Sequence, residues 1–352
     1  MREIKTIGII GEGKMGTNLF YYLLDFGFSI IWVCSKDAET EKIIKSFDKK
    51  LKRSLDAGIM YETTCSIMHE NTLITNDLQQ LQKCDLIIEA ISENLTIKRK
   101  LFDELDRIAG GRCIFATNSS SFKSSELLSS ESRKDKLLGL HFFYPIALKN
   151  IMEFIVNDST SEDTIKKMHH FLGIIKREPL NLKENDGFIL NKIFLDFQNE
   201  AFLIVNEGEI KIPQMDALVK NYLFPVSVFD FCDSVGNDIM LTSVRNYIRD
   251  YQDSDHYMPF INELERLVRE NKLGMRSEAG FYSYPVDVIP EDFILKDINQ
   301  GFIENIVMRL SNTLASSIKK FSIQSGISLK ILNEAMKEYL GTEKDLVAFL
   351  KL

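Results

Sequence analysis

The chain of 352 residues lacks the features that mark membrane-spanning, metal-binding and disulfide-rich proteins. It has no uninterrupted apolar run of about 18 residues, the length that a membrane-spanning helix needs, and no signal-peptide core follows its first residues. Its five cysteines are odd in number, scattered, and never spaced as CxxC, so we expect neither a disulfide framework nor a metal site. These absences favour a cytoplasmic protein that does not bind a membrane.

Basic residues are too few for a nucleic-acid partner. Lysine and arginine number 43 against 51 aspartates and glutamates, which leaves a net charge of −8, whereas a phosphate backbone needs a basic face. The hydrophobic content of 45% is typical of a soluble globular protein, and the length fits two or three domains. Any anionic ligand must therefore be bound by local basic residues.

A glycine-rich loop near the N-terminus is the first positive signal. Residues 5 to 10 form a short apolar run typical of a strand, and after the loop apolar residues recur at helical spacing as far as residue 26. In such a unit the first glycine makes the tight turn, the second lets backbone N–H groups approach a pyrophosphate, and the third allows close packing of helix and strand. We predict a dinucleotide site, rather than a turn without a ligand, with these cofactor residues: Gly11, Gly13, Lys14, Met15 and Gly16.

The end of the second predicted strand, residues 28 to 34, leaves the choice between NAD and NADP open. An NAD site usually places Asp or Glu there to accept hydrogen bonds from the adenosine ribose, but this chain has Cys34, followed by Ser35 and Lys36. Without a carboxylate, Ser35 and Lys36 can donate to the 2′-phosphate of NADP. Alternatively they open a solvated loop, in which Asp37 caps the next helix or itself reaches the ribose. We expect NAD, with NADP as the alternative.

Further apolar runs predict a parallel sheet. Three short runs read as strands, at 72–75, 86–90 and 113–117, and a polar helix is predicted at 95–108 between the last two. Repeated strand, helix and strand imply an α/β Rossmann-type dinucleotide-binding domain, whose ligands lie at the carboxyl ends of the strands. Polar residues follow two of those ends, at Glu89–Asn94 and Asn118–Ser121.

Five ordered motifs make the chain similar to a known family. Each is given with the family segment that it matches: Glu89–Asn94 with Glu-Ala-x-x-Glu-Asn, Thr117–Ser121 with Ser-Asn-Thr-Ser-Ser, His141–Pro145 with His-Phe-Phe-Asn-Pro, Asp186–Lys192 with Pro-Gly-Phe-Ile-Val-Asn-Arg, and Gly280–Tyr284 with Gly-Phe-Tyr-x-Tyr. Over roughly residues 4 to 285 the chain thus resembles the 3-hydroxyacyl-CoA dehydrogenase family. The resemblance implies an NAD(P)-dependent oxidoreductase that interconverts 3-hydroxyacyl and 3-ketoacyl thioesters.

The resemblance implies catalytic roles for Ser120, His141, Glu153 and Asn191. A neutral His141 can take the proton of the 3-hydroxyl, and its charged form can return that proton in the reverse direction. Glu153 lies in an apolar strand, where a carboxylate needs a partner, and pairing with His141 would orient the ring; the alternative is a surface residue of an edge strand. Ser120 and Asn191 would polarise and orient the β-keto thioester, although Ser120 can also cap a helix.

The resemblance also implies residues around the two ligands. Glu93 and Lys98 match positions near the nicotinamide half of the cofactor, and Asn118 belongs to the same cofactor-binding edge. Ser46 and Arg53 lie on a predicted basic helix, at the spacing of residues that contact CoA in relatives, although such a charge run is usually a solvated face.

Departures from the family motifs concern substrate specificity. Tyr144 replaces the asparagine that precedes the proline beside His141, which changes the bulk and hydrogen bonding of the acyl pocket. Asp186 and Lys192 replace Pro and Arg. We therefore expect Tyr144 to contact an unusual acyl group.

The predicted organisation has three parts. They are an NAD(P)-binding Rossmann domain at 1–185, the all-α C-terminal domain of the family at 186–286, and a second, degenerate helical half-domain at 287–352. The last rests on an internal similarity, because residues 306–336 repeat the pattern of 189–219 with Met308 in the place of Asn191. We expect this copy to be structural and to pack where a second subunit would otherwise dock, so a monomer is favoured over a dimer.

Three classes of function remain open. The leading class is a dehydrogenase of 3-hydroxyacyl groups carried by CoA or by an acyl carrier protein. A dehydrogenase of a free 3-hydroxy acid would need a cation for the carboxylate, where this chain offers Ser120 and Asn191. A non-catalytic dinucleotide-binding protein would have no need of the intact catalytic set.

Overall fold

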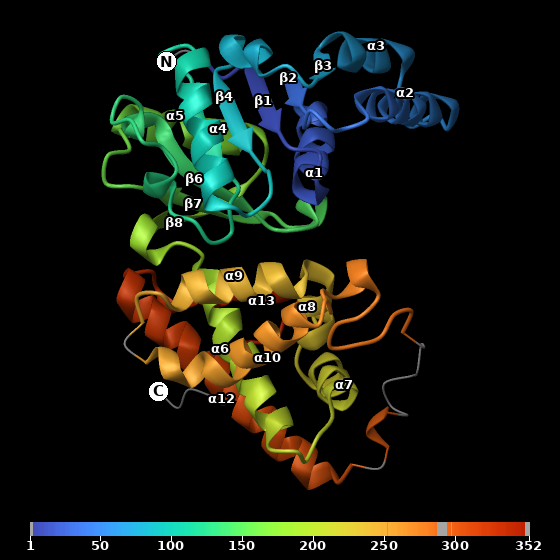
Figure 1. Cartoon of the computed structure of the whole chain (residues 1–352), viewed down its shortest axis with the longest axis vertical. Coiled ribbons are helices and arrows are strands. Elements are labelled where there is room, and N and C mark those ends of the chain that lie inside the picture. Colours follow the sequence, from blue (N-terminus) through green and yellow to red (C-terminus); the bar gives the residue numbers. More distant parts are fainter. Residues whose placement is uncertain (1–2, 252, 287–293, 297, 349–352) are drawn as a thin grey trace. The chain divides into compact units, whose positions relative to one another are not determined.

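A computed structural model describes residues 3–251, 253–286, 294–296 and 298–348. The chain divides into two compact units, Met1–Gly187 and Phe188–Leu352, called here the first and second unit (Figure 1). The predicted start of a further half-domain at residue 287 lies outside the described residues. The division into three parts therefore stays a prediction.

The first unit is built on one eight-stranded sheet, in the order β3-β2-β1-β4-β5-β6-β7-β8. Strands from β3 to β6 in this order are parallel to their neighbours, whereas β7 runs antiparallel to β6 and parallel to β8. The strands are β1 (Thr6–Ile10), β2 (Ser29–Val33), β3 (Thr72–Thr75), β4 (Leu86–Glu89), β5 (Ile114–Thr117), β6 (Leu137–Phe142), β7 (Ile151–Val156) and β8 (Glu178–Lys183). Because the strand order reverses at β1, between β2 and β4, a ligand crevice is expected beyond the carboxyl ends of these strands.

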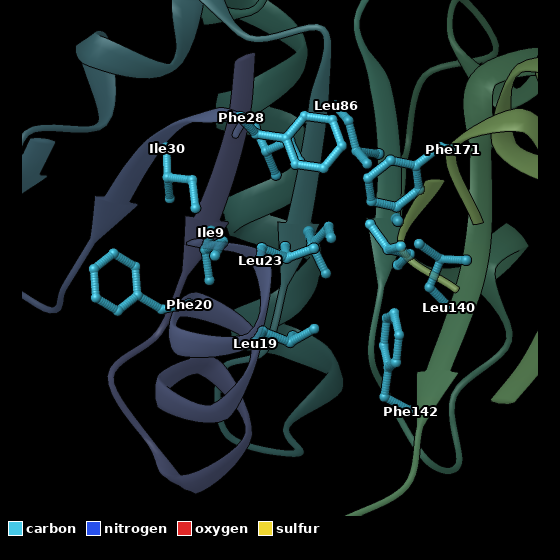
Figure 2. Packing of buried hydrophobic residues seen from close by; sticks show 14 of the residues in the cluster. Ile9, Leu19, Phe20, Leu23, Phe28, Ile30, Leu86, Leu140, Phe142 and Phe171 are labelled. Carbon is cyan, nitrogen blue, oxygen red and sulfur yellow. The ribbon is translucent and has the colours of Figure 1, made fainter. Parts of the chain in front are cut away.

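Helices cover both faces of this sheet. They are α1 (Lys14–Leu23), α2 (Thr40–Asp56), α3 (Glu62–Glu70), α4 (Leu95–Ile108) and α5 (Glu162–Ile174). Side chains of α1 and α5 such as Leu19 and Phe171 share an apolar cluster with Ile9 of β1 (Figure 2). Phe102 of α4 belongs to a second cluster with Ile10, the next residue of the same strand. Since neighbouring residues of a strand point to opposite faces, the two clusters are the two cores of a sheet covered on both sides.

Trp32 ties the core to the glycine loop. Its ring stacks on Phe20 of α1 with the centroids 4.3 Å apart, and its indole Nε1 donates a hydrogen bond to the carbonyl oxygen of Gly11 at 2.8 Å. A buried indole needs such a partner for its N–H. The bond therefore fixes the start of the loop against β2.

The second unit is helical. Its helices are α6 (Ile189–Asn206), α7 (Ile212–Tyr222), α8 (Phe229–Val235), α9 (Asn237–Ile248), α10 (Met258–Arg269), α12 (Gln300–Ser325) and α13 (Leu329–Leu340). Helix α6 is buried on most of its surface, and α12 packs along it (Figure 1). A helix that is apolar around most of its circumference belongs in the centre of a bundle.

The closing Gly-Phe-Tyr motif has a structural role in this unit. Asp233 of α8 accepts hydrogen bonds from the backbone N–H groups of Phe281 and Tyr282, both at 2.9 Å. A Cβ atom on Gly280 would lie 1.9 Å from Asp233 Oδ1, so only glycine fits there. The motif thus anchors the segment after α10 to α8.

The predicted fold class is confirmed: an α/β Rossmann-type domain precedes an all-α region. The internal repeat stays a prediction. In both proposed copies a glycine with positive φ, Gly208 at 89° and Gly326 at 73°, lies within two residues after a long helix, and a shorter helix follows.

Candidate functional site

The glycine loop has the shape that a dinucleotide needs. Gly11 has a φ of 110°, and a Cβ on it would lie 2.6 Å from the carbonyl oxygen of Ala90. A Cβ on Gly16 would lie 2.0 Å from the carbonyl oxygen of Gly11, so helix α1 can approach the loop only with glycine at this position. A Cβ on Gly13 would meet no atom of the described residues within 4 Å beyond its chain neighbours. The second glycine thus faces open space, where a pyrophosphate can reach the backbone at the start of α1.

The end of β2 holds a carboxylate that was not predicted there. Glu12, inside the glycine loop, accepts hydrogen bonds from the Ser35 backbone N–H at 2.9 Å and from the Ser35 hydroxyl at 2.6 Å. Burial raises the pKa of Glu12, but the bonds from Ser35 outweigh it and the pKa is lowered. Burial, together with the charge of Glu12, raises the pKa of the Cys34 thiol to about 11. Ser35, a predicted donor to a 2′-phosphate, is thus bonded to an acid, while Lys36 is exposed.

Buried charges join the ends of β4 and β5. The Lys98 ammonium lies 2.6 Å from Glu89 Oε1 and 3.3 Å from Glu93 Oε2, and Lys98 and Glu89 are almost completely buried. Glu89 also accepts a hydrogen bond from the Thr117 hydroxyl at 2.6 Å. Removal of one member would leave a buried charge without compensation, so the set fixes the two strand ends relative to each other.

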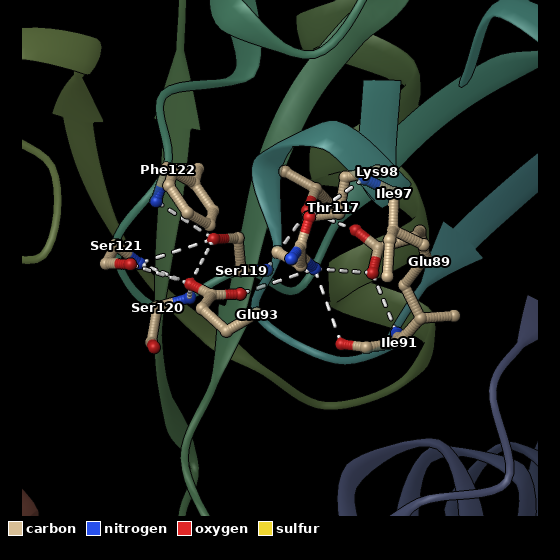
Figure 3. A network of polar contacts seen from close by, with 11 residues as sticks. Glu89, Ile91, Glu93, Ile97, Lys98, Thr117, Ser119, Ser120, Ser121 and Phe122 are labelled. Atoms are coloured by element: carbon tan, nitrogen blue, oxygen red, sulfur yellow. Dashed lines mark hydrogen bonds and ion pairs between the residues drawn. The ribbon is translucent and has the colours of Figure 1, made fainter. Parts of the chain in front are cut away.

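The serine turn after β5 is bonded to Glu93 (Figure 3). Glu93 Oε1 accepts hydrogen bonds from the Ser119 hydroxyl at 2.6 Å, the Ser120 N–H at 3.1 Å and the Ser121 N–H at 3.0 Å. The Ser119 hydroxyl in turn accepts a bond from the Phe122 N–H at 2.9 Å. Ser119, rather than Ser120, therefore supports the turn that follows. The side chain of Asn118 accepts a bond from the Phe142 N–H at 3.0 Å and links the end of β5 to β6.

His141 and Glu153 form a buried pair. They occupy directly opposite positions on the antiparallel strands β6 and β7, which places both side chains on one face. His141 Nδ1 lies 2.7 Å from Glu153 Oε2, and the two residues are 5% and 0% exposed. An ionised carboxylate can only accept, so opposite that form of Glu153 the Nδ1–H donates and Nε2 carries the lone pair of a neutral ring.

Lys14 and Tyr144, predicted to bind cofactor and substrate respectively, lie together. The Lys14 ammonium is 3.9 Å from the centre of the Tyr144 ring, and Tyr144 is 47% exposed. A cation over an aromatic face is attracted by its electron density. Met15, the next loop residue, packs on the core of the first unit.

The predicted CoA residues lie on an exposed helix face. Ser46 and Arg53 are both exposed on α2, two turns apart and so on one side of the helix. They stay a predicted binding surface.

Asn191 lies in the first turn of helix α6 of the second unit and is held by two tyrosines. Its Nδ2 donates to the Tyr247 hydroxyl at 2.9 Å, and its Oδ1 accepts from the Tyr339 hydroxyl at 3.0 Å. Tyr247 lies on α9 and Tyr339 on α13. The predicted substrate amide thus belongs to a hydrogen-bonded group of three helices.

The described part of the chain shows neither a metal-ligand cluster nor a membrane-spanning helix. Within residues 3–251, 253–286, 294–296 and 298–348 no three His, Cys, Asp or Glu side chains gather as a metal ion would require. In the same ranges no helix combines the length and the apolar character needed to cross a bilayer.

The sheet, the glycine loop and the buried histidine at one edge define an NAD-dependent oxidoreductase of the Rossmann type. Residues 6–185 match the family described as "3-hydroxyacyl-CoA dehydrogenase, NAD binding domain", and residues 187–284 match "3-hydroxyacyl-CoA dehydrogenase, C-terminal domain". The chain belongs to the 3-hydroxyacyl-CoA dehydrogenase family. The predicted family, enzyme class and NAD cofactor are thereby confirmed.

Individual relatives are distant in sequence and match about four fifths of this chain. A 3-hydroxybutyryl-CoA dehydrogenase of Clostridioides difficile is 28% identical over 279 residues, which cover 79% of this chain and 99% of the relative. The mitochondrial hydroxyacyl-coenzyme A dehydrogenase of Homo sapiens is 29% identical over 291 residues, covering 80% and 91%.

Solved structures share the fold. A 3-hydroxybutyryl-CoA dehydrogenase from Escherichia coli K12 superposes with a TM-score of 0.83 at 16% identity, covering 99% of this chain and 91% of that one. An (S)-3-hydroxybutyryl-CoA dehydrogenase from Ralstonia eutropha gives 0.71 at 26% identity, covering 81% and 100%. The first of these extends the shared fold over nearly the whole chain.

Several site residues were missed by the sequence analysis. Glu89 carried a usable signal, because an acid at the end of the apolar strand 86–89 needs a buried partner. Glu12 carried a weaker one, a carboxylate inside a phosphate-binding loop. Tyr247 and Tyr339 carried none, since their contact with Asn191 depends on how three helices pack.

Proposed function

We propose that the chain interconverts 3-hydroxyacyl and 3-ketoacyl thioesters of CoA, with His141 as general acid and base. The observation that carries the proposal is the buried His141–Glu153 pair at the carboxyl edge of the sheet that bears the glycine loop. A carboxylate hydrogen-bonded to Nδ1 orients the ring and stabilises the imidazolium that proton transfer creates.

Oxidation of the 3-hydroxyl group removes one hydride from C3 and one proton from the oxygen, and reduction returns both. The glycine loop would hold NAD, whose nicotinamide would supply the hydride acceptor for C3 of the alcohol and, when reduced, the hydride donor for the ketone. As the C3–H bond breaks and the carbonyl forms, Nε2 of His141 takes the hydroxyl proton. Glu153 holds the Nδ1 proton and stabilises the imidazolium that results. In reduction, the same imidazolium protonates the oxygen at C3.

Ser120 and Asn191 are proposed to bind the substrate. The Ser120 N–H is bonded to Glu93, and the backbone position of Ser120 is therefore set by a partly buried carboxylate. A serine hydroxyl and an asparagine amide can both donate to a thioester or ketone oxygen. Glu93 and Lys98 are proposed to hold the cofactor edge, with Ser46 and Arg53 binding the CoA portion.

An acyl carrier protein thioester is the second candidate substrate. It is favoured by Tyr144, which replaces a small amide with an exposed ring held by Lys14 and so alters the acyl side of the pocket. The chemistry at C3 is the same for both carriers.

The experiment measures NADH oxidation with acetoacetyl-CoA and with an acetoacetyl carrier-protein thioester. We expect turnover with the CoA thioester and a loss of roughly 10²- to 10⁴-fold in kcat for His141→Ala. His170→Ala, an exposed histidine of α5, is the control and should leave kcat unchanged. Turnover with the carrier-protein thioester alone would select the second candidate. Binding of NADH with no turnover of either would indicate a non-catalytic dinucleotide-binding protein.

A further inference from the structure

We infer that Tyr339, in the C-terminal helix α13, is a positioning residue for the substrate amide of Asn191. The inference deepens the proposed function and rests on the role assigned to Asn191 there. It gives a part of the chain beyond residues 187–284, which match the family's C-terminal domain, a place in the substrate site.

The geometry is a clamp on one side chain. The Tyr339 hydroxyl donates to Asn191 Oδ1 at 3.0 Å, while Asn191 Nδ2 donates to the Tyr247 hydroxyl at 2.9 Å. Because a hydroxyl can donate or accept, the two tyrosines fix the plane and position of the amide, but they do not determine which end carries the oxygen and which the nitrogen. An amide has two donor and two acceptor positions, and the clamp uses one of each. The other N–H is the one proposed to meet a substrate oxygen.

The clamp is carried by well-packed helices. Leu332, Met336 and Leu340 of α13 are fully buried, and the Tyr339 ring packs edge-on against Phe194 of α6 with the centroids 5.8 Å apart. The segment after α13 is also fixed, because Asn333 bonds to Asp345 and to the Leu346 N–H. A site group is precise only when its supporting residues are themselves held.

This assignment changes what the C-terminal segment is expected to do. Met308 stands where a second copy would need its own Asn191, and its side chain is 52% exposed. Because methionine cannot replace the asparagine amide, Met308 by itself indicates a purely structural role for the C-terminal segment. The Tyr339 hydroxyl of the same segment adds a hydrogen bond to the side-chain amide of Asn191 in α6.

The test is a double-mutant cycle with Tyr339→Phe and Asn191→Ala, measured as kcat and KM for acetoacetyl-CoA. Tyr339→Phe keeps the ring packed on Phe194 and removes only the hydroxyl, so the variant is expected to fold. Tyr222→Phe, on α7, is the matched control for loss of a tyrosine hydroxyl. Tyr247→Phe removes the other half of the clamp. NADH affinity and the melting temperature are recorded for every variant.

We expect Tyr339→Phe to lower kcat/KM about tenfold, since misplacement of a positioning group by a fraction of an ångström is costly in rate. The same change should have no further effect in the Asn191→Ala background, and NADH affinity should not change. Equal losses in both backgrounds, or wild-type kcat/KM in Tyr339→Phe, would overturn the inference while leaving the role of Asn191 intact. Wild-type activity in Asn191→Ala would remove Asn191 from the proposed function and the clamp with it.

A second, independent observation concerns cofactor specificity: we propose that Glu12 selects NAD over NADP in place of the missing acid at the end of β2. Two of the roughly four acceptor positions of its carboxylate are taken by Ser35, which aims the group at the strand end. A further bond comes from the Glu12 backbone, and the acceptor capacity that remains suits a hydroxyl of the adenosine ribose. The negative charge would repel a 2′-phosphate.

Fluorescence titration with NADH and NADPH tests this without any turnover. We expect the wild type to prefer NADH, and Glu12→Gln to lower the ratio of NADH to NADPH affinity at least tenfold. The substitution removes both the repulsion of the 2′-phosphate and a charged acceptor for the ribose hydroxyl. Asp37→Asn, which removes the nearest exposed acid of the following loop, should leave the ratio unchanged. A ratio that falls in Asp37→Asn but not in Glu12→Gln would overturn the proposal and assign the ribose to Asp37.

Discussion

At the scale of single residues, Glu153 decides what His141 can do. The carboxylate is fully buried and lies 2.7 Å from Nδ1, so that with an ionised carboxylate as acceptor Nε2 is the basic nitrogen. A glutamine at the same position is nearly the same size, but it carries no charge to stabilise an imidazolium and its amide can also donate. Glu153→Gln therefore removes the charge of this side chain while nearly keeping its size.

Glu153→Gln is predicted to lower kcat for acetoacetyl-CoA reduction by about 10²- to 10⁴-fold, with KM changed only a few-fold. The analogous change from Asp to Asn in a serine-protease triad costs about 10⁴-fold through the wrong tautomer. Steady-state kinetics give both constants, and NADH titration shows that the cofactor site is intact. If kcat stays at the wild-type level, Glu153 has no part in proton transfer.

The site could be anticipated only where chemistry follows from local sequence. Glu153 was expected to pair with His141 because a carboxylate in an apolar strand needs a partner, and the register of β6 and β7 places the two side by side. Glu12 was missed because its role depends on a loop that bends toward β2. Tyr339 lies 148 residues from Asn191, and no short-range pattern connects them.

At the scale of elements, strands marked by a short apolar run were predicted, whereas a strand of alternating polarity and a helix with no buried residue were not. The apolar runs at 72–75, 86–90 and 113–117 correspond to β3, β4 and β5 within a residue at each end. Edge strand β8 was missed, since it alternates buried Leu180 and Leu182 with polar residues and contains a proline. Helix α3 was missed because it has no fully buried residue, so its apolar pattern is weak.

Arg133 shows how one side chain completes an element. It donates to Asp106 Oδ1 at 2.8 Å and to the carbonyl oxygens of Ala109, Gly110 and Cys113 at 2.8 to 3.2 Å. The end of α4 has carbonyls with no partner inside the helix, and the guanidinium supplies one. With 6% exposure, Arg133 is also shielded from water.

Arg133→Met is predicted to lower the free energy of unfolding at neutral pH by about 3 to 5 kcal/mol, because it leaves a partly buried carboxylate and several carbonyls without their partner. Arg112→Met, an exposed neighbour, is the control and should cost little. Urea unfolding measures both. An Arg133→Met chain as stable as the control would show that water replaces the guanidinium.

The same contact predicts a pH dependence. Burial raises the pKa of Asp106, but the bonds from Arg133 and Ser132 outweigh it, and the pKa is lowered from 3.8. A carboxyl with a lowered pKa in the folded state contributes stability above its unfolded pKa and loses it as the pH falls through the folded value. The difference between wild type and Arg133→Met should therefore shrink as the pH falls below 3.8.

At the scale of the whole molecule, the C-terminal segment determines which surfaces are covered. Leu310, Leu314 and Ile318 of α12 are almost completely buried, and α12 packs along α6. Polar contacts reinforce this packing, because Arg309 pairs with Glu200 and Glu207 of the α6 region, and the Ser317 hydroxyl donates to Asp196 at 2.7 Å. The surface of α6 is thus occupied by the same chain.

A monomer of 40.5 kDa is therefore predicted in solution. An apolar helix face drives association only while it is exposed, and here α12 already buries that face of α6. Light scattering on the purified full chain at micromolar concentration measures the mass, and hydrogen exchange maps any protected surface. A dimer protected over residues 187–284 would contradict the prediction. A dimer protected elsewhere would keep α12 on α6 and place the interface on another surface.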